Sequence, residues 1–575
     1  MENHQCEHAD VAIVGAGMAG LFSAWRLLTH NPNLKIHLFD LLNRTGGRLD
    51  TDRVYIRDLD KDPSQEASVE VKDEEGGMRF NTSMQQLFTL LNELGLCSQV
   101  VHFGSGDQNN RFCVRGRSFT VSESAANNNA LWKELYNLAP AEQDKSPTDI
   151  ITAVYKDILS ANNRLAPDNP TPEFWQEFRL RFAWKGIPLN EWGLWSLLRD
   201  FGLTEECIEM LTNTVGFAGP FLSNEVSAGE AYQILMDFPK DPQFFSLRQG
   251  FATLPDTLRD RLLALGAQIH LNSHVTSLSR DDQTLHLQVQ SLADKTTRTV
   301  SAAKVILALP AKAMRDLYAA SPALNADPKS PALHANLGSV VGMRLCKVNL
   351  YYRDAWWHDT LSGQPPVSDG GNFTSLPMGS AYVFDPMVLS DAARNGPAAL
   401  TIYCDFNNTN FWEQLQATGK PFWSPMQDTH SHADPQVLFA ASEKVVEEAT
   451  RQLKELFRTL YVPRPVLTSF RLWSGEHQFG AAYHQWVRFA NDETVMGELA
   501  NPVPDVYVCN EAWSDSQGWV NGSLRSAENV LTKHFGISPL VPDPGTWTVP
   551  CAIAQAGPAS EPPHFRNKGG AAWLR

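Results

Sequence analysis

The stretch that decides the fold runs from Val11 to Asp40 and reads VAIVGAGMAGLFSAWRLLTHNPNLKIHLFD. The apolar run Val11–Val14 predicts a buried parallel strand. A glycine-rich turn follows it at once, a helix is predicted over 21–28, and a second strand over 35–39 ends in Asp40. Strand, GxGxxG turn, helix, strand and acid in this order predict a Rossmann-like unit that binds a dinucleotide.

Each position of the turn has a chemical reason. Gly15 permits the tight turn, Gly17 lets the backbone approach a pyrophosphate, and Gly20 packs the helix on the strand. The predicted helix points its positive end at the phosphates, and Met18 and Ala19 of the turn before it are candidate cofactor-binding residues. Asp40 can accept hydrogen bonds from ribose hydroxyls. A glycine turn without a ligand is the alternative, and the surrounding strand–helix–strand pattern disfavours it.

Length and charge limit the remaining possibilities. A chain of 575 residues is too long for one core, so two or more interleaved domains are expected. The formal net charge of −16 disfavours a nucleic-acid partner, because phosphate binding needs a basic surface.

The sequence also suggests a cellular setting. Residues 1–10 are polar, without the apolar core of a signal peptide, and no run is long enough to span a bilayer. Eight cysteines are scattered without a Cys-x-x-Cys pair, so we expect reduced thiols rather than a disulfide framework. Together these features predict a soluble, intracellular or cytoplasmic protein with no membrane contact.

Two further glycine motifs decide between cofactors. Thr45–Arg48 reads TGGR and Glu75–Phe80 reads EGGMRF. With them the chain resembles the flavin amine oxidase family of monoamine, polyamine and L-amino acid oxidases. The resemblance implies non-covalently bound FAD. It places Gly47 and Arg48 at the flavin phosphates, and Gly77 and Met78 along the isoalloxazine ring.

The Gly-Gly-Met-Arg form resembles the L-amino acid oxidase branch, of the mollusc achacin and escapin type. There the arginine, Arg79 in this chain, binds the substrate carboxylate and also lies beside the cofactor. A planar guanidinium suits this role because it can donate two parallel hydrogen bonds. A structural salt bridge to an acid such as Glu74 is the alternative for Arg79.

The resemblance continues to the end of the chain. It implies that Val275 holds the adenine through its backbone, that Glu511 binds the ribityl chain, and that Gly518, Trp519 and Val520 lie near N1 and O2 of the flavin. Helix-end N–H groups there stabilise the reduced anionic ring. At position 510 the family usually has glycine and this chain has asparagine, which tolerates left-handed backbone geometry.

Further candidate residues come from the middle of the chain. The resemblance places Lys347 near flavin N5 through a water, as a catalytic group with Arg79; a solvated edge-strand lysine is the alternative. Tyr382 is the candidate to join Arg79 on the carboxylate, with Phe384 and Asp385 as competitors. Trp473 and Trp519 are candidate aromatic walls around the reacting amine.

These features predict an α/β (α+β) fold, in which a Rossmann-like FAD-binding domain is interleaved with a substrate-binding sheet domain and a helical domain. The predicted segments are 1–105, 241–330 and 471–540 for the FAD-binding domain, 106–240 for the helical domain, 331–470 for the substrate-binding domain, and 541–575 for a loosely attached tail. The acidic stretch Asp58–Glu75 is expected to be a solvated loop with an exposed strand.

The predicted function is oxidative deamination of L-amino acids by FAD and oxygen, giving α-keto acid, ammonia and hydrogen peroxide. Alternatives are an amine or polyamine oxidase, a flavin-dependent dehydrogenase or desaturase, and a non-catalytic flavin protein. We expect a homodimer and no metal site, although His4, Cys6 and His8, or His430, His432 and Asp434, could be considered as ligands. Broad specificity is expected, with basic and large amino acids ahead of acidic ones, and an inward-pointing Asp385 would favour lysine or arginine.

Overall fold

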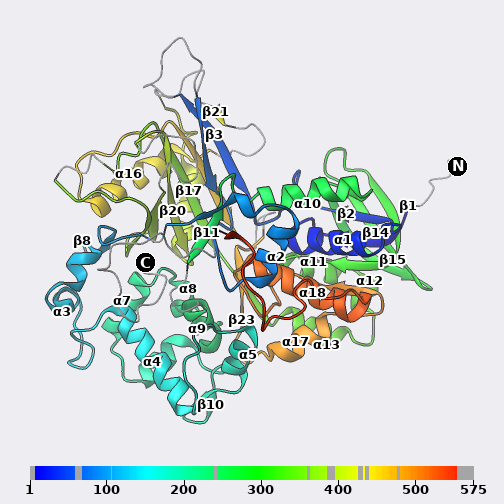
Figure 1. Ribbon diagram of the computed structural model, residues 1–575, viewed down its shortest axis with the longest axis horizontal. Helices are drawn as coiled ribbons and strands as arrows, with labels where there is room; N and C mark the ends of the chain where they lie inside the picture. Colours follow the sequence, from blue (N-terminus) through cyan, green and yellow to red (C-terminus); the bar gives the residue numbers. More distant parts are fainter. Residues whose placement is uncertain are drawn as a thin grey trace.

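A computed structural model of the chain describes residues 7–57, 68–104, 106–237, 243–358, 363–384, 395–424, 432–433, 440–474 and 480–552. Figure 1 shows three regions: a sheet with its helices at the right, a second sheet at the upper left, and a group of helices at the lower left. Each of the two sheet regions is assembled from segments that are distant in the sequence, which confirms the predicted mixed α/β class with interleaved parts.

The first sheet contains the predicted glycine-rich turn. Its order is β12-β2-β1-β15-β14-β13, and β24 also pairs with β15. The strands are β1 (Glu7–Val14), β2 (Ile36–Phe39), β12 (Gln268–His270), β13 (Ser273–Asp281), β14 (Thr284–Ser291), β15 (Thr297–Leu307) and β24 (Val506–Val508). Because β12, β2, β1, β15 and β24 run parallel, their carboxyl ends meet at one edge.

Helices bury both faces of this sheet. One face carries α1 (Met18–His30), α2 (Gln85–Glu93), α10 (Thr253–Ala264) and α18 (Val520–Phe535), and the other carries α11 (Ala311–Ala320), α12 (Pro322–Asn325), α13 (Ser330–Leu337) and α17 (Asp492–Leu499). Val11 and Ile13 belong to the first core, and Ala12 and Val14 to the second. Burial on both faces explains why the strand is apolar throughout rather than alternating.

The second sheet has the order β22-β17-β20-β19-β18-β7-β8. Its strands are β22 (Leu467–Trp473), β17 (Leu345–Tyr352), β20 (Ala398–Asp405), β19 (Ser380–Val383), β18 (Gly370–Thr374), β7 (Arg111–Val114) and β8 (Arg117–Thr120), and α15 (Asn408–Thr418) and α16 (Glu443–Phe457) pack against it. The pairing places β7 and β8 in this sheet although we assigned residues 106–240 to the helical domain. The hairpin of β7 and β8 is too short for its hydrophobic periodicity to separate it from the helices that follow. Only its pairing with β18 shows that it belongs to the second sheet.

The helical region lies below the second sheet, at the lower left of the view in Figure 1. It comprises α3 (Val121–Leu135), α4 (Pro147–Ala161), α5 (Pro172–Leu180), α6 (Leu194–Asp200), α7 (Glu205–Thr214), α8 (Gly219–Leu222), α9 (Ala228–Met236), β9 (Ala183–Trp184) and β10 (Ile187–Pro188). Its aromatic side chains, such as Trp175 and Phe178, form a closed core of their own.

Short sheets join the regions. They are β3 (Thr51–Arg57) with β4 (Ser68–Glu74) and β21 (His432–Ala433), β5 (Phe80–Asn81) with β11 (Phe244–Leu247) and β6 (Val100–His102), and β16 (Val340–Met343) with β23 (Tyr483–Trp486). The expectation of a solvated acidic loop over 58–75 is wrong for its second part. Asp73, Glu74 and Glu75 are buried, because β4 packs against the second sheet, where Asp73 accepts a hydrogen bond from Thr401 and Lys347 donates one to Glu74 O. Residues 58–67 lie outside the described residues.

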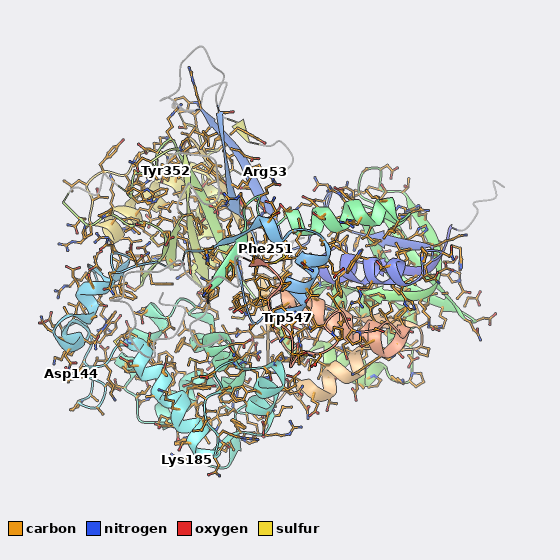
Figure 2. All side chains as sticks on the ribbon, viewed as in Figure 1. Arg53, Asp144, Lys185, Phe251, Tyr352 and Trp547 are labelled. Atoms are coloured by element: carbon orange, nitrogen blue, oxygen red, sulfur yellow. A yellow bond between two sulfur atoms is a disulfide. The ribbon has the colours of Figure 1, made fainter. Side chains whose placement is uncertain are left out.

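The start of the predicted loose tail is anchored. Trp547, labelled near the middle of the view in Figure 2, donates a hydrogen bond from Nε1 to Thr89 Oγ1 at 2.9 Å and packs against Phe88. Cys551 is buried and forms a disulfide with Cys97, which follows α2. The expectation of reduced thiols is therefore wrong for this pair, since a separation of 454 residues hides it from any spacing rule.

Among the described helices, none has the length and hydropathy needed to cross a lipid bilayer.

Replacing Cys551 with serine tests the anchor. We expect a lower Tm, because a disulfide that closes so long a loop restricts the unfolded chain and contributes roughly 2–4 kcal/mol. Cys97→Ser should lower the Tm by the same amount, and the double variant by no more, as measured by scanning calorimetry. Losses that add in the double variant, or a peptide map without the Cys97–Cys551 cross-link, would contradict the pairing.

Candidate functional site

A large cavity opens at the carboxyl edge of the first sheet. Its volume is about 650 Å³, and it runs from the glycine-rich turn to the start of α18. Most of the predicted cofactor residues line it: Gly15, Gly17, Met18, Ala19, Asp40, Gly47, Arg48, Gly77, Val275, Glu511, Gly518, Trp519 and Val520. Gly20 lies behind it, while Met78 and Arg79 line an adjoining cavity.

The three glycines of the turn differ in what surrounds them. Gly15 has φ +103°, and a Cβ there would lie 2.4 Å from the carbonyl oxygen of Ala308. A Cβ on Gly20 would lie 1.9 Å from the carbonyl oxygen of Gly15. A Cβ on Gly17 meets only the Cα of Gly47, at 3.9 Å, so this position opens into the cavity. Gly15 and Gly20 therefore serve the backbone, whereas Gly17 leaves room for a ligand.

Two helix N-termini point donors at this cavity. The N-cap of α1 is Gly17 and that of α18 is Trp519, and neither helix has a side-chain cap or an acidic residue in its first turn. Uncapped first-turn N–H groups carry partial positive charge and attract anions. The cavity therefore suits an elongated ligand with a pyrophosphate near α1 and an electron-rich group near α18, as FAD has.

Asp40 is held at the end of β2. Its carboxylate accepts hydrogen bonds from Ala16 N at 2.7 Å and Leu42 N at 2.9 Å. Burial raises the pKa of Asp40, and these two N–H groups oppose the rise. Both bonds fix the carboxylate at the cavity wall, where its remaining lone pairs can accept ribose hydroxyls.

Glu511 is already fully engaged by the protein. One oxygen accepts Gly518 N at 2.8 Å and His484 N at 2.9 Å, and the other accepts His484 Nδ1 at 2.8 Å and Arg48 at 2.5 Å. Burial alone would raise the pKa of Glu511, but Arg48 and His484 hold it below its usual range. Its four acceptor positions are filled, so it orients Arg48 and the turn before α18; binding a ribityl hydroxyl would require one of these bonds to be exchanged.

His484, which sequence reasoning missed, completes this network. Its Nε2 faces the backbone N–H of Ala311 at 3.3 Å while Nδ1 faces Glu511. Burial lowers the pKa of His484. A neutral ring that donates from Nδ1 and accepts at Nε2 satisfies both contacts.

A second, smaller cavity of about 160 Å³ adjoins the first and shares Arg48, Gly77, Trp519 and Val520 with it. Arg79, Lys347, Tyr382, Trp473 and Met78, all predicted site residues, line it. The sequence did not single out Tyr403 or Phe217, which also line it, nor assign a role to Tyr483 in its wall. Only the folded structure brings these three residues together, because they come from β20, the link after α7, and β23.

Arg79 has no hydrogen-bonding or ionic partner in the described part of the chain. Its guanidinium carbon lies 4.8 Å from the centre of the Phe244 ring and 5.6 Å from that of Phe103. Cation–π contacts of this kind hold the group without using its N–H donors. The alternative of a salt bridge to Glu74 is wrong, because Glu74 accepts hydrogen bonds from Thr51 and Phe251 N instead.

Lys347 is buried on β17, between β20 and β22, so it is not a solvated edge-strand lysine. Its Nζ donates to the carbonyl oxygens of Glu74 at 2.7 Å and Gly76 at 2.8 Å, and approaches Met78 Sδ at 3.6 Å. Burial lowers its pKa, and the neighbouring acids oppose the fall. The lysine therefore holds the segment that leads into Arg79.

The aromatic candidates lie around the same space. Trp473 is fixed by a hydrogen bond from Nε1 to Glu75 O at 2.6 Å, and Trp519 caps α18 between the two cavities. The Tyr382 ring lies 6.1 Å from that of Tyr403. Phe384 packs behind Tyr382 and does not line the cavity, and Asp385 lies outside the described residues.

Two remaining sequence questions concern Asn510 and metals. Asn510 does not adopt positive φ, so its tolerance of left-handed geometry is not needed. The described residues contain no group of three or more potential metal ligands. His4, Cys6, His430 and Asp434 lie outside those residues.

A layer of buried charge lies beneath the Glu74–Arg79 segment. Five carboxyl groups face three cations there: Asp50, Asp52, Asp73, Glu74 and Glu75 with Arg44, Arg471 and Lys347. Burial raises the pKa of Glu74 to about 8 and that of Asp73 to about 6. An excess of acids in a buried layer requires that some of them stay protonated at neutral pH.

The clearest case is the pair of Asp52 and Glu75. Asp52 Oδ2 accepts Tyr351 OH at 2.9 Å and Glu75 Oε1 accepts Asn349 at 3.4 Å, while Asp52 Oδ1 and Glu75 Oε2 have no other partner among the described groups. Burial, followed by the nearby charge of Glu75, raises the pKa of Asp52 well above its usual range. One proton shared by the two carboxyls satisfies both oxygens.

Asp52→Asn should remove a pH-dependent cost of folding. With a raised pKa, Asp52 contributes its full stability below the unfolded pKa near 4, and loses it as pH rises toward the folded value, by about 1 kcal/mol per pH unit. The amide can donate to Glu75 at every pH. The Tm of the variant should therefore exceed that of the wild type increasingly from pH 5 to pH 8.

Asp50→Asn is the matched control. It removes a carboxylate that is ion-paired with Arg44 and Arg471, and should lower the Tm at both pH values. An Asp52→Asn variant whose Tm difference from the wild type is the same at pH 5 and pH 8 would show that the pair shares no proton.

Gly17→Leu should yield a folded protein that does not retain FAD. The backbone at Gly17 is extended, with φ −76° and ψ −174°, so leucine is sterically allowed, but its side chain fills the cavity where a pyrophosphate would lie. Gly497→Leu, where a Cβ meets no atom within 4 Å, is the control and should retain the cofactor. FAD released by heat would be quantified by fluorescence; stoichiometric FAD in the Gly17 variant would contradict this site.

The comparisons with known proteins agree with this geometry. Residues 18–530 match the family described as flavin containing amine oxidoreductase. Achacin of Lissachatina fulica is 25% identical over 570 residues, covering 93% of this chain and 94% of its own. Aplysianin-A of Aplysia kurodai is 24% identical over 581 residues, covering 93% and 92%.

Solved structures show the same fold at low identity. Putrescine oxidase superposes with a TM-score of 0.62 at 16% identity, covering 92% of this chain and 99% of its own. Cyclohexylamine oxidase from Brevibacterium oxydans IH-35A gives a TM-score of 0.58 at 16% identity, covering 91% and 97%. Because the family match spans most of the chain and includes most of the residues that line both cavities, the chain belongs to the flavin-containing amine oxidases.

Proposed function

We propose that this flavoprotein is an L-amino acid oxidase, which converts L-amino acids and oxygen to α-keto acids, ammonia and hydrogen peroxide. The observation that carries the proposal is Arg79, a guanidinium in the wall of the smaller cavity with no partner among the described residues. A partly buried guanidinium without an ionic partner among the described residues attracts an anion, and an amino acid brings one in its carboxylate.

The surroundings of Arg79 suit a carboxylate. Phe244 and Phe103 lie against the guanidinium and leave its planar edge for two parallel hydrogen bonds. The hydroxyl of Tyr382 or Tyr403 can add a further donor, since both rings line the same cavity. Carboxylate binding at this end sets the position of Cα and of the amine.

The walls then orient the reacting atoms. Trp473 is held by Glu75 O and Trp519 by the start of α18, so the two rings form fixed sides of the cavity between Arg79 and the shared boundary. FAD, when bound in the larger cavity, supplies the acceptor for the Cα hydride and passes the electrons to oxygen. The protein's main contribution to catalysis in this proposal is to place Cα correctly against that acceptor.

Lys347 has a positioning role in this proposal. Its three nearest acceptors, the carbonyls of Glu74 and Gly76 and the sulfur of Met78, belong to the segment that ends in Arg79. A charge held there also lies beside the boundary of the two cavities, where it would favour a negatively charged reduced cofactor.

Amine oxidation is the main alternative, because the solved relatives include a putrescine oxidase bound to putrescine. Arg79 argues against a diamine here. A second ammonium group would meet a guanidinium of like charge at one end of a cavity of about 160 Å³.

The Cys97–Cys551 disulfide bears on the cellular setting. Disulfides persist mainly in oxidising compartments, so we propose that the protein works in such a compartment rather than in the reducing cytosol that the sequence suggested.

Arg79→Gln tests the proposed function. The purified wild type should generate peroxide from L-amino acids and none from the corresponding decarboxylated amines. The variant should keep FAD but lose about 10²–10³-fold in kcat/KM, equivalent to roughly 3–4 kcal/mol, because the carboxylate is left without its bidentate partner.

Arg79→Lys is the matched variant, because it keeps the charge and removes the planar fork. It should recover only part of the loss. Near-normal kcat/KM in Arg79→Gln, or wild-type turnover of amines with none of amino acids, would show that the cavity does not recognise a carboxylate.

A further inference from the structure

The smaller cavity has two chemically different ends. Arg79 and Tyr382 belong to one, where Met78, Phe103 and Phe244 pack together. The other end is lined by Val215, Phe217, Ile234, Leu235, Leu345 and Tyr483, and Phe373 lies between the two ends, with its ring 6.4 Å from that of Tyr382. Tyr403 lies between them, with its ring 6.1 Å from that of Tyr382 and 5.9 Å from that of Phe217.

This second end is apolar and aromatic. Phe217 stands edge-on to both Tyr403 and Tyr483, at 5.9 and 6.3 Å between ring centres. Ile234 and Leu235 approach from α9, and Val215 from the link after α7. None of the described residues that line this end carries a charged side chain.

Glu75 lines the cavity beside Gly76, away from this end, and Asp405, a buried acid that follows Tyr403, does not line the cavity. Asp405, at the end of β20, accepts the backbone N–H groups of Ala218 and Gly219 at 3.2 and 2.7 Å. It therefore holds the turn that carries Phe217, and it is not part of the lining. Arg79 and Lys347 cannot serve an acidic side chain there, since Arg79 lies at the other end and the Lys347 donors face Glu74 O, Gly76 O and Met78 Sδ.

We infer that the enzyme prefers L-amino acids with large apolar side chains, such as phenylalanine, leucine and methionine, over lysine, arginine and glutamate. The inference rests on the proposed carboxylate contact with Arg79, which leaves the side chain to occupy the aromatic end. The cavity as a whole, with both of its ends, measures about 160 Å³, close to the roughly 150 Å³ of an apolar cavity that holds one benzene ring. A charged side chain would lose its hydration there without gaining a partner.

This conclusion narrows the specificity expected from the sequence, which put basic amino acids beside large ones. The case for basic substrates rested on the acidic chain and on an inward-pointing Asp385, which lies outside the described residues, whereas the lining of one pocket decides which side chain is bound. Ile234 is the residue through which the preference can be changed, because it is partly exposed and faces this cavity from α9.

The first experiment measures kcat/KM of the wild-type holoenzyme, by peroxide release, for phenylalanine, leucine, methionine, lysine, arginine and glutamate, all as L-isomers. Anaerobic bleaching of the flavin by each amino acid is recorded in parallel. We expect the three apolar substrates to exceed the three charged ones by at least about tenfold. Lysine or arginine as the best substrate would overturn the inference and leave the proposed function standing.

The second experiment uses Ile234→Asp with Ile234→Asn as its uncharged control. The carboxylate should raise the ratio of kcat/KM for lysine to that for leucine by at least about tenfold, and the amide should lower leucine turnover without raising that ratio. Equal ratios in the two folded variants would show that this end does not contact the side chain. If no amino acid bleaches the wild-type flavin while an amine does, the proposed function itself has failed.

Discussion

The buried ammonium group of Lys347 is the contact on which the site depends. It joins β17, whose position is fixed by neighbours on both sides, to the carbonyl oxygens of Glu74 and Gly76. Those carbonyls belong to the segment that continues into Arg79. A Cβ on Gly76 would lie only 2.0 Å from the carbonyl oxygen of Arg48, so this segment also lies directly against the motif that faces the larger cavity.

The site exists only where the three regions meet. Arg79 follows β4, Trp519 begins α18, Phe373 comes from β18, and Ile234 comes from α9. No single region contributes both the anion-binding end and the apolar end of the smaller cavity. Interleaving of the chain is therefore a requirement of the chemistry, because cofactor and substrate must be held by parts that pack as one body.

The charge that faces the smaller cavity at Arg79 has the opposite sign to the net charge of the chain. The chain is strongly acidic, yet the group free to bind a ligand in the smaller cavity, within the described structure, is a guanidinium. The excess of negative charge beneath it is contained by proton sharing between Asp52 and Glu75 and by ion pairs of Asp50. Arg48 is likewise neutralised by Glu511, whereas Arg79 has no ionic partner among the described residues.

The sequence by itself determined the dinucleotide-binding turn, the mixed α/β class, the family, and the positions of Arg79, Lys347 and Trp519 beside the cavities. The turn rests on a short motif whose spacing is dictated by local backbone geometry, as Gly15 and Gly20 show, whereas the family and the three site positions came from the resemblance of several motifs to a known family. Only the tertiary structure decided that Cys97 pairs with Cys551, that β7 and β8 join the second sheet, and that Glu511 is held by Arg48 and His484. It alone brought Phe217, Tyr403 and Tyr483 to one end of the cavity. These contacts join residues far apart in the chain, and a pattern along the sequence carries no signal for packing that forms only when the three regions meet.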